Sequence, residues 1–142
     1  MNCVTSISEI APDSRLKFEL ARQYQQAAYV LRANISDGNA QCEAAWRHNA
    51  IHAIELFLSA FLCENGVSEK DIRALQHDLF QRAEMAKTHG LYLETPTRNT
   101  LRSMSERREY LLVRYDTGQK LTSLRNLCTT LDEIAGKVAF SF

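Results

Sequence analysis

The chain has few glycines and prolines and no excess of charge of either sign. Its 142 residues include five glycines and two prolines, too few for the many turns of an all-β fold. The 17 basic and 17 acidic residues balance, whereas a protein dedicated to duplex DNA usually carries a strong positive excess. No glycine-rich phosphate loop or nucleophile elbow is present, which argues against classical nucleotide-hydrolysing and dinucleotide-dependent enzymes.

Paired cysteines and long apolar runs are missing as well. The four cysteines form no C-x-x-C pair and no zinc-finger spacing with histidine, so we expect reduced thiols. The longest uncharged apolar run, Leu56 to Cys63, is far shorter than the roughly 20 residues that span a bilayer. No signal-peptide core is found before Arg15. We expect a cytoplasmic protein with no membrane partner, folded as one domain over 1–142 with a flexible N-terminus at 1–12.

Apolar residues recur at helical spacing along most of the chain. A first stripe begins at a capping residue, Asp13 or Ser14, and continues to Leu31, which predicts an amphipathic helix. A second helix is expected over about 39–65. Its centre, 50–62, is apolar on most faces, a pattern typical of the central helix of a bundle.

Three more helices are expected after Gly66, a residue that commonly ends helices. Ser68 caps the third, which is predicted to run unbroken to His89. Pro96 opens the fourth, which is predicted to run unbroken to about Tyr115. The last carries a regular stripe from Leu121 to Val138. With short connections between them, these elements predict an all-α, up-and-down bundle of about five helices without strands.

Three short motifs appear in a particular order along the chain. Glu55 is embedded in the apolar central helix, His77-Asp-Leu79 follows in the next helix, and Leu112-Val-Arg-Tyr115 ends the fourth. In this order and spacing the motifs resemble those of HEPN domains, and the resemblance covers roughly Arg15 to Phe142.

The resemblance implies a helical bundle that forms homodimers. Many HEPN domains are ribonucleases, others partner small nucleotidyltransferases, and some are binding or scaffold modules. The ribonucleases combine an arginine, which stabilises phosphate charge, with a histidine a few residues later that serves acid–base chemistry. Here Arg108 is followed at that distance by Arg114, which keeps its proton at ordinary pH. The resemblance therefore favours a non-catalytic module that binds RNA, a nucleotide or a partner protein.

The expected binding corner contains Arg108, Arg114, Tyr115, His77 and Glu55. Arginine can hold a phosphate, and tyrosine can stack on a base. A carboxylate inside an apolar run must be paired or become neutral, so we expect Glu55 to contact His77, Arg114 or Tyr115. The structural alternative is a polar network that sets the helix register, beside a solvated basic helix face.

Two other functions fit some of the residues. A metal-independent ribonuclease of the toxin or defence type would need His77 or His89 in place of the missing histidine. Arg82 and His89 also match the ribonuclease spacing, but within the third helix. A metal-binding bundle would use His48 and His52, which share a face of the central helix, yet no Glu-x-x-His motif completes that site. We expect no metal and no cofactor.

Overall fold

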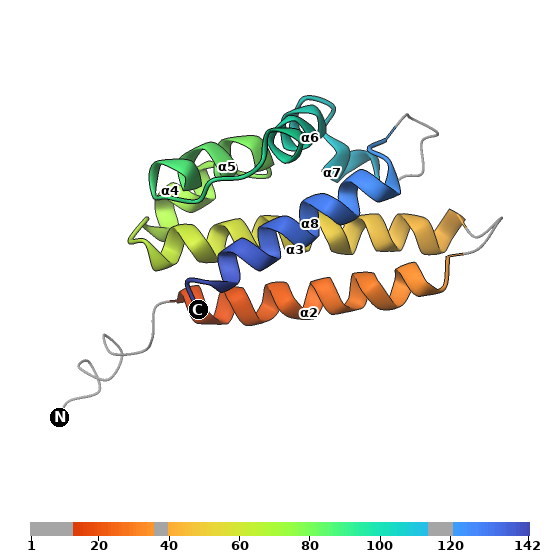
Figure 1. Ribbon diagram of the computed structural model, residues 1–142, viewed down its shortest axis with the longest axis horizontal. Helices are drawn as coiled ribbons and strands as arrows, with labels where there is room; N and C mark the ends of the chain where they lie inside the picture. Colours follow the sequence, from red (N-terminus) through yellow and green to blue (C-terminus); the bar gives the residue numbers. More distant parts are fainter. Residues whose placement is uncertain (1–12, 36–39, 114–120) are drawn as a thin grey trace.

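The computed structural model describes residues 13–35, 40–113 and 121–142 and is all-α over those ranges (Figure 1). These ranges hold seven helices and no strand. The helices are α2 (Asp13–Ala33), α3 (Ala40–Glu64), α4 (Glu69–Ala74), α5 (Leu79–Thr88), α6 (Thr95–Glu106), α7 (Glu109–Leu112) and α8 (Leu124–Ala139). The prediction of a helical bundle is confirmed.

The long central helix α3 organises the bundle. It packs against α2, α8, α5 and α4, and Figure 1 shows α2 and the shorter helices α4 to α7 on opposite sides of it. Its centre is buried on most faces, as its apolar sequence predicts. The largest fully buried side chains of α3 are Trp46, Ile54, Phe57, Leu58 and Leu62.

The predicted bounds of the first two helices agree closely with the structure. Helix α2 begins at Asp13, and α3 covers Ala40–Glu64. Gly66 follows α3 with φ of 88°, the left-handed conformation that ends helices at little steric cost in glycine. Ser68 accepts a hydrogen bond from the Asp71 backbone N–H, as expected of a cap.

The predicted third and fourth helices are wrong as single helices. The third is split into α4 and α5, with a break at Gln76, and the fourth is split into α6 and α7, with a break at Arg108. The last helix begins at Leu124 rather than at Leu121. Each break contains a residue with φ of 51°, which a continuous right-handed helix does not accommodate.

A polar cluster joins α6 to α8 around Glu133. Its carboxylate accepts hydrogen bonds from the Thr97 hydroxyl, the Glu94 backbone N–H and the Lys137 ammonium. Burial by itself would raise the pKa of Glu133, but these donors outweigh burial and hold the pKa below its ordinary value of 4.5. The ionised form is therefore favoured in the folded protein.

The lowered pKa of Glu133 predicts a loss of stability in acid. Because the folded pKa lies below the unfolded one, the contribution is complete above a pH of about 4.5 and is lost as pH falls through the folded pKa. We expect Glu133→Gln to flatten this acid limb in urea unfolding measured from neutral pH down to about pH 3. Glu106→Gln, at an exposed position, is the control. An acid limb as steep in Glu133→Gln as in the wild type would contradict the prediction.

None of the helices within the described residues is long and apolar enough to span a membrane.

Candidate functional site

The two helix breaks lie beside one another. Gln76 and Arg108 are the non-glycine residues with positive φ among the described residues, each at 51°. Such a conformation is uncommon for residues with these side chains, and strained backbone tends to cluster at functional sites. Both residues line the same groove, whose volume is about 530 Å³.

The groove lies between the α4–α5 connection and the α6–α7 connection. The backbone N–H of Phe80 donates to the Ser105 hydroxyl over 3.0 Å, which ties the start of α5 to the end of α6. Asp78 caps α5 by accepting from the Gln81 backbone N–H at 3.0 Å. The lining side chains are mostly polar, and they include Gln76, His77, Asp78, Gln81, Ser105, Arg108 and Tyr110.

His77 lies in this groove and is held by Glu55 from the central helix. Its Nδ1 is 2.9 Å from Oε1 of Glu55, and because a carboxylate only accepts, the ring is the donor. The Glu55 side chain is 15% exposed and the His77 side chain is 50% exposed. The Tyr110 ring lies 4.8 Å from the His77 ring, tilted by 32°. Two rings thus form one wall of an open groove.

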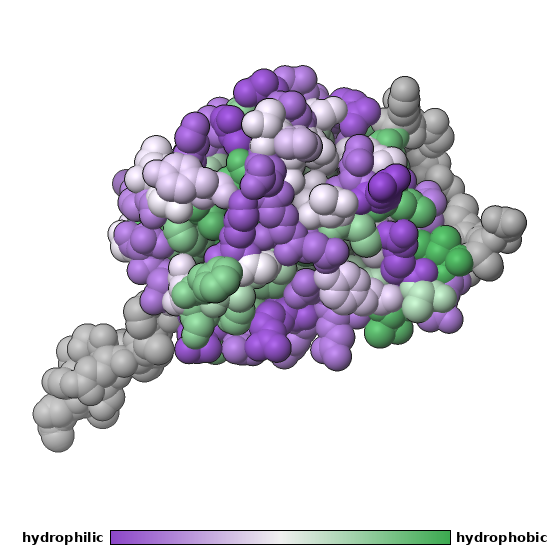
Figure 2. All heavy atoms as spheres, in the orientation of Figure 1, coloured by the Kyte–Doolittle hydropathy of each residue, from purple (hydrophilic) through white to green (hydrophobic). Residues whose placement is uncertain are grey.

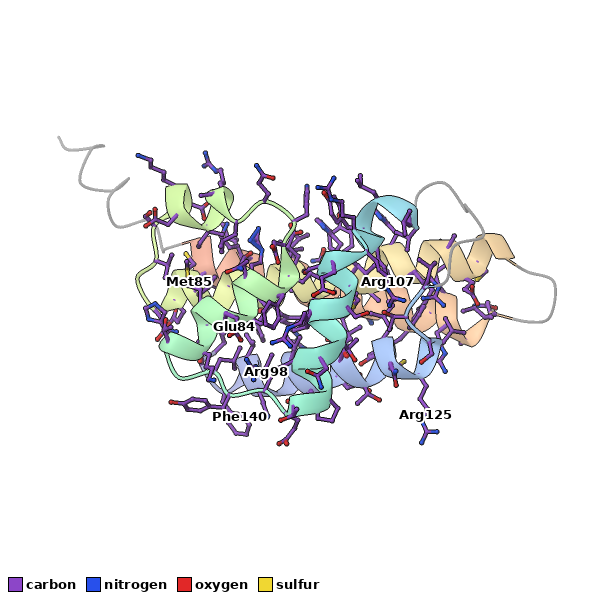
Figure 3. All side chains as sticks on the ribbon, turned by 90° about the horizontal axis from the view of Figure 1, so that it is seen from above. Glu84, Met85, Arg98, Arg107, Arg125 and Phe140 are labelled. Carbon is purple, nitrogen blue, oxygen red and sulfur yellow. The ribbon has the colours of Figure 1, made fainter. Side chains whose placement is uncertain are left out.

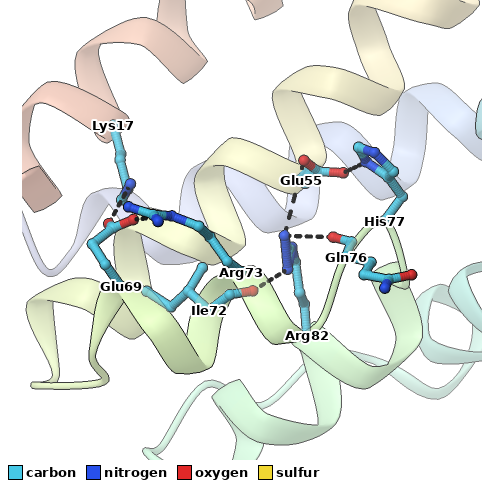
Figure 4. A network of polar contacts seen from close by, with 8 residues as sticks. All are labelled: Lys17, Glu55, Glu69, Ile72, Arg73, Gln76, His77 and Arg82. Atoms are coloured by element: carbon cyan, nitrogen blue, oxygen red, sulfur yellow. Dashed lines mark hydrogen bonds and ion pairs between the residues drawn. The ribbon is translucent and has the colours of Figure 1, made fainter.

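Arg82 stabilises the first helix break, at Gln76, and also lies close to Glu55 (Figure 4). Arg82 is 4% exposed. Its guanidinium donates hydrogen bonds to two backbone carbonyls, that of Ile72 at 3.3 Å and that of Gln76 at 2.6 Å. It also lies 3.9 Å from a Glu55 oxygen. Burial lowers the pKa of Arg82 from its ordinary value, while the negative charges of Glu55 and Asp78 oppose that shift. The Ile72 carbonyl also accepts from the Leu75 backbone N–H, whereas the Gln76 carbonyl lies at the helix break, where Arg82 supplies its donor.

Glu109 stabilises the second helix break, at Arg108, through buried hydrogen bonds. It is fully buried, and its oxygens accept from the Thr122 backbone N–H at 3.0 Å, the Thr122 hydroxyl at 2.8 Å and the Arg107 guanidinium at 2.7 Å. The buried Arg47 of α3 donates to the Thr122 carbonyl. This network joins α3, α7 and the segment before α8, and it positions the neighbouring Arg108 at the groove.

Three of the five residues expected in the binding corner come together. His77 and Arg108 line the groove, and Glu55 of the central helix α3 contacts His77. The expected contact between Glu55 and His77 is therefore present. Arg114 and Tyr115 lie outside the described residues.

The alternative pairs weighed from the sequence do not form comparable sites. Arg82 is buried and bonded to carbonyls, whereas His89 is exposed at the other end of α5, roughly 10 Å away along the helix axis. The rings of His48 and His52 are 6.3 Å apart, and His52 packs against Tyr24. Within the described ranges, no group of three or more His, Cys, Asp or Glu side chains could hold a metal ion.

The basic helix face expected from the sequence lies between Arg98 and Arg125, and several of its arginines make contacts within the bundle. Arg98 donates to Glu84 over 2.8 Å, and Arg102 lies over the Phe80 ring at 4.6 Å. Arg125, by contrast, points away from the bundle (Figure 3). Arg108 differs from these arginines because it lines the groove.

The groove offers a cation, two adjacent rings, two side-chain amides and one carboxylate. Such a surface can hold a phosphate at Arg108 and a base against Tyr110 and His77. The supporting roles of Arg82 and Glu109 were missed by sequence reasoning. Arg82 was considered only as a possible ribonuclease partner of His89, and Glu109 belongs to no motif or regular stripe. The chain matches no protein-family model, no curated protein and no solved structure.

Proposed function

We propose that this chain is an HEPN-like helical module that binds single-stranded RNA in the groove between the two helix breaks, without cleaving it. The observation that carries the proposal is that Arg108, His77 and Tyr110 line one groove. Proteins that bind single strands combine a cation for the backbone with aromatic rings for the bases. The His77 side chain is half exposed and Arg108 is exposed, so a strand can reach both from solvent.

Affinity for a labelled single-stranded RNA tests the proposal. We expect Tyr110→Ala and Arg108→Gln each to weaken binding by about tenfold or more, because one base stacked or one phosphate paired is worth about 1–3 kcal/mol. Tyr110→Phe keeps the ring and is expected to bind as the wild type does. Lys87→Gln removes an exposed charge on α5 outside the groove and serves as the charge-matched control. Fluorescence anisotropy at fixed salt measures all five proteins.

The same samples distinguish binding from cleavage. Intact RNA that is retained by the wild type and released by Tyr110→Ala and Arg108→Gln supports the binding module. Wild-type protein that retains no RNA, or Tyr110→Ala and Arg108→Gln proteins that bind as tightly as the wild type, would contradict it. In that case a protein partner becomes the next ligand class to examine.

A metal-independent ribonuclease is the second candidate, and the Glu55–His77 pair favours it. A carboxylate on Nδ1 fixes the ring orientation and leaves Nε2 as the second ring nitrogen for proton transfer. In this case RNA is cleaved without added metal, and both His77→Ala and Arg108→Ala abolish cleavage. Cleavage that persists in His77→Ala would exclude His77 as the acid–base group.

The proposal includes a homodimer through α2. Leu16 and Val30 are 64% and 60% exposed, and Leu20 lies between them on the same side of the helix. Exposed apolar side chains at this spacing can pack against a second helix. We expect the wild type to have twice the monomer mass by light scattering at micromolar concentration, and Leu16→Glu/Val30→Glu to be monomeric. A monomeric wild type would exclude the dimer.

A further inference from the structure

A second groove lies on another part of the molecule, between α2 and α8. Its volume is about 510 Å³, within the range of small-molecule sites. Phe18 and Arg22 of α2 line one wall, Ala135 and Gly136 of α8 line the other, and Phe57 of α3 lies between them. Figure 2 shows hydrophobic residues gathered where the end of α8 meets the start of α2, with hydrophilic residues around them.

Two specific contacts connect lining residues of this second groove. At one end the Tyr29 hydroxyl donates to the Asp132 carboxylate. Burial, followed by this hydrogen bond, raises the pKa of Tyr29 to about 12, so the hydroxyl remains a donor at neutral pH. At the other end the Phe142 ring stacks on Phe18 with centroids 4.5 Å apart and planes 8° apart. The groove that contains these two contacts has the volume of a small-ligand site.

The charge inside this groove is positive. The Arg22 guanidinium lies 5.9 Å from the Phe18 ring, and no carboxylate pairs with it among the described residues. Asp132, the acidic group of the lining, already accepts from Tyr29. Arg15 lies over the Phe142 ring at 5.7 Å and is 3.8 Å from Glu19 at the exposed surface. The guanidinium N–H groups of Arg22 can therefore donate hydrogen bonds to an anionic ligand.

The wall opposite Arg22 is apolar and has room. Ala135, Gly136 and Ala139 carry little or no side chain, and a Cβ added at Gly136 would meet nothing within 4 Å. A flat hydrophobic group can lie against these residues and the Phe142 ring. The groove thus pairs a cation on one wall with an apolar surface on the other.

We propose that the groove between α2 and α8 binds a small aromatic carboxylate, with the carboxylate on Arg22 and the ring against the α8 wall. The proposal is independent of RNA binding, because no residue is shared between the linings of the two grooves. A planar carboxylate matches the planar guanidinium through two parallel hydrogen bonds. A neutral ligand of the same shape loses those bonds and keeps only the apolar contact.

Calorimetric titration with 1-naphthylacetate, and with the uncharged 1-naphthylacetamide, tests this site. We expect the carboxylate to bind the wild type about tenfold more tightly than the amide does. Arg22→Gln is expected to remove that difference by weakening the carboxylate alone. Gly136→Leu is expected to abolish binding of both ligands by filling the groove, while thermal unfolding stays at or above the wild-type temperature because leucine favours helix more than glycine does.

Arg125→Gln is the matched control, since it removes one exposed charge of α8 outside this groove. It is expected to bind the carboxylate as the wild type does. The proposal is overturned if the carboxylate and the amide bind equally, if Gly136→Leu binds as the wild type does, or if the wild type takes up neither ligand at millimolar concentration.

Discussion

Replacement of Glu109 by alanine is expected to lower the free energy of unfolding by about 2 to 4 kcal/mol, because each buried hydrogen-bond donor left without its acceptor costs about 1–3 kcal/mol. The carboxylate is fully buried and accepts hydrogen bonds from Thr122 and Arg107. Without it, a backbone N–H and a hydroxyl lose their acceptor, and the partly exposed Arg107 guanidinium loses one of its contacts. Against a typical total of about 5–15 kcal/mol, this loss removes a large part of the stability.

Urea unfolding followed by circular dichroism measures the effect of Glu109→Ala. Glu106→Ala, an exposed position one turn earlier at the end of α6, is the matched control and is expected to change the unfolding midpoint little. Glu109→Gln is expected to fall between the two, because an amide oxygen still accepts but the charge is lost. If Glu109→Ala unfolds at the same urea concentration as the control, the buried network does not stabilise the second break.

Replacement of Arg82 by methionine is expected to cost about 2 to 3 kcal/mol of unfolding free energy, because a carbonyl loses its donor and a carboxylate loses a nearby positive charge. The carbonyl is that of Gln76 and the carboxylate is that of Glu55, whereas the Ile72 carbonyl keeps the Leu75 backbone N–H as a donor. Methionine keeps much of the aliphatic volume, so the change reports mainly on the polar contacts. Arg73→Met on α4, whose side chain is largely exposed, is the control.

Arg82→Met should also weaken RNA binding, although Arg82 does not line the groove. Arg82 bonds to the carbonyl of Gln76, the residue before His77, so its loss relaxes the backbone that places the histidine ring. Salt dependence of binding gives a readout that distinguishes this positioning role from a direct phosphate contact. We expect the salt slope of Arg82→Met to match the wild type, whereas Arg108→Gln has a shallower slope. A shallower slope in Arg82→Met would indicate a direct contact instead.

The helical class and the central position of α3 could be predicted from the sequence. Apolar spacing located α2 and α3 to within a residue or two, and the apolar centre of α3 is buried as predicted. Gly66 and Pro96 marked helix ends because their backbone preferences are local properties. The contact between Glu55 and His77 was also expected, since a carboxylate in an apolar run needs a partner.

The helix breaks could not be predicted by the same reasoning. The residues Leu101, Met104 and Arg108 continue the helical period, which favours one unbroken helix. In the structure Arg108 adopts φ of 51° and is exposed, and Glu109 takes the inward position. The backbone change shifts the buried face by one residue. This conformation is stabilised by the hydrogen bond between Glu109 and Thr122, which is thirteen residues away in sequence. No local pattern carries that information.

The sequence by itself determined that this chain forms helices, where the longest of them begin and end, and which helix lies at the centre. These properties depend on spacing, caps and apolar content within a few turns. The tertiary structure decided where the helices break and which side chains meet in the groove. Those features depend on buried polar groups finding partners from distant segments, so they follow from packing of the whole bundle.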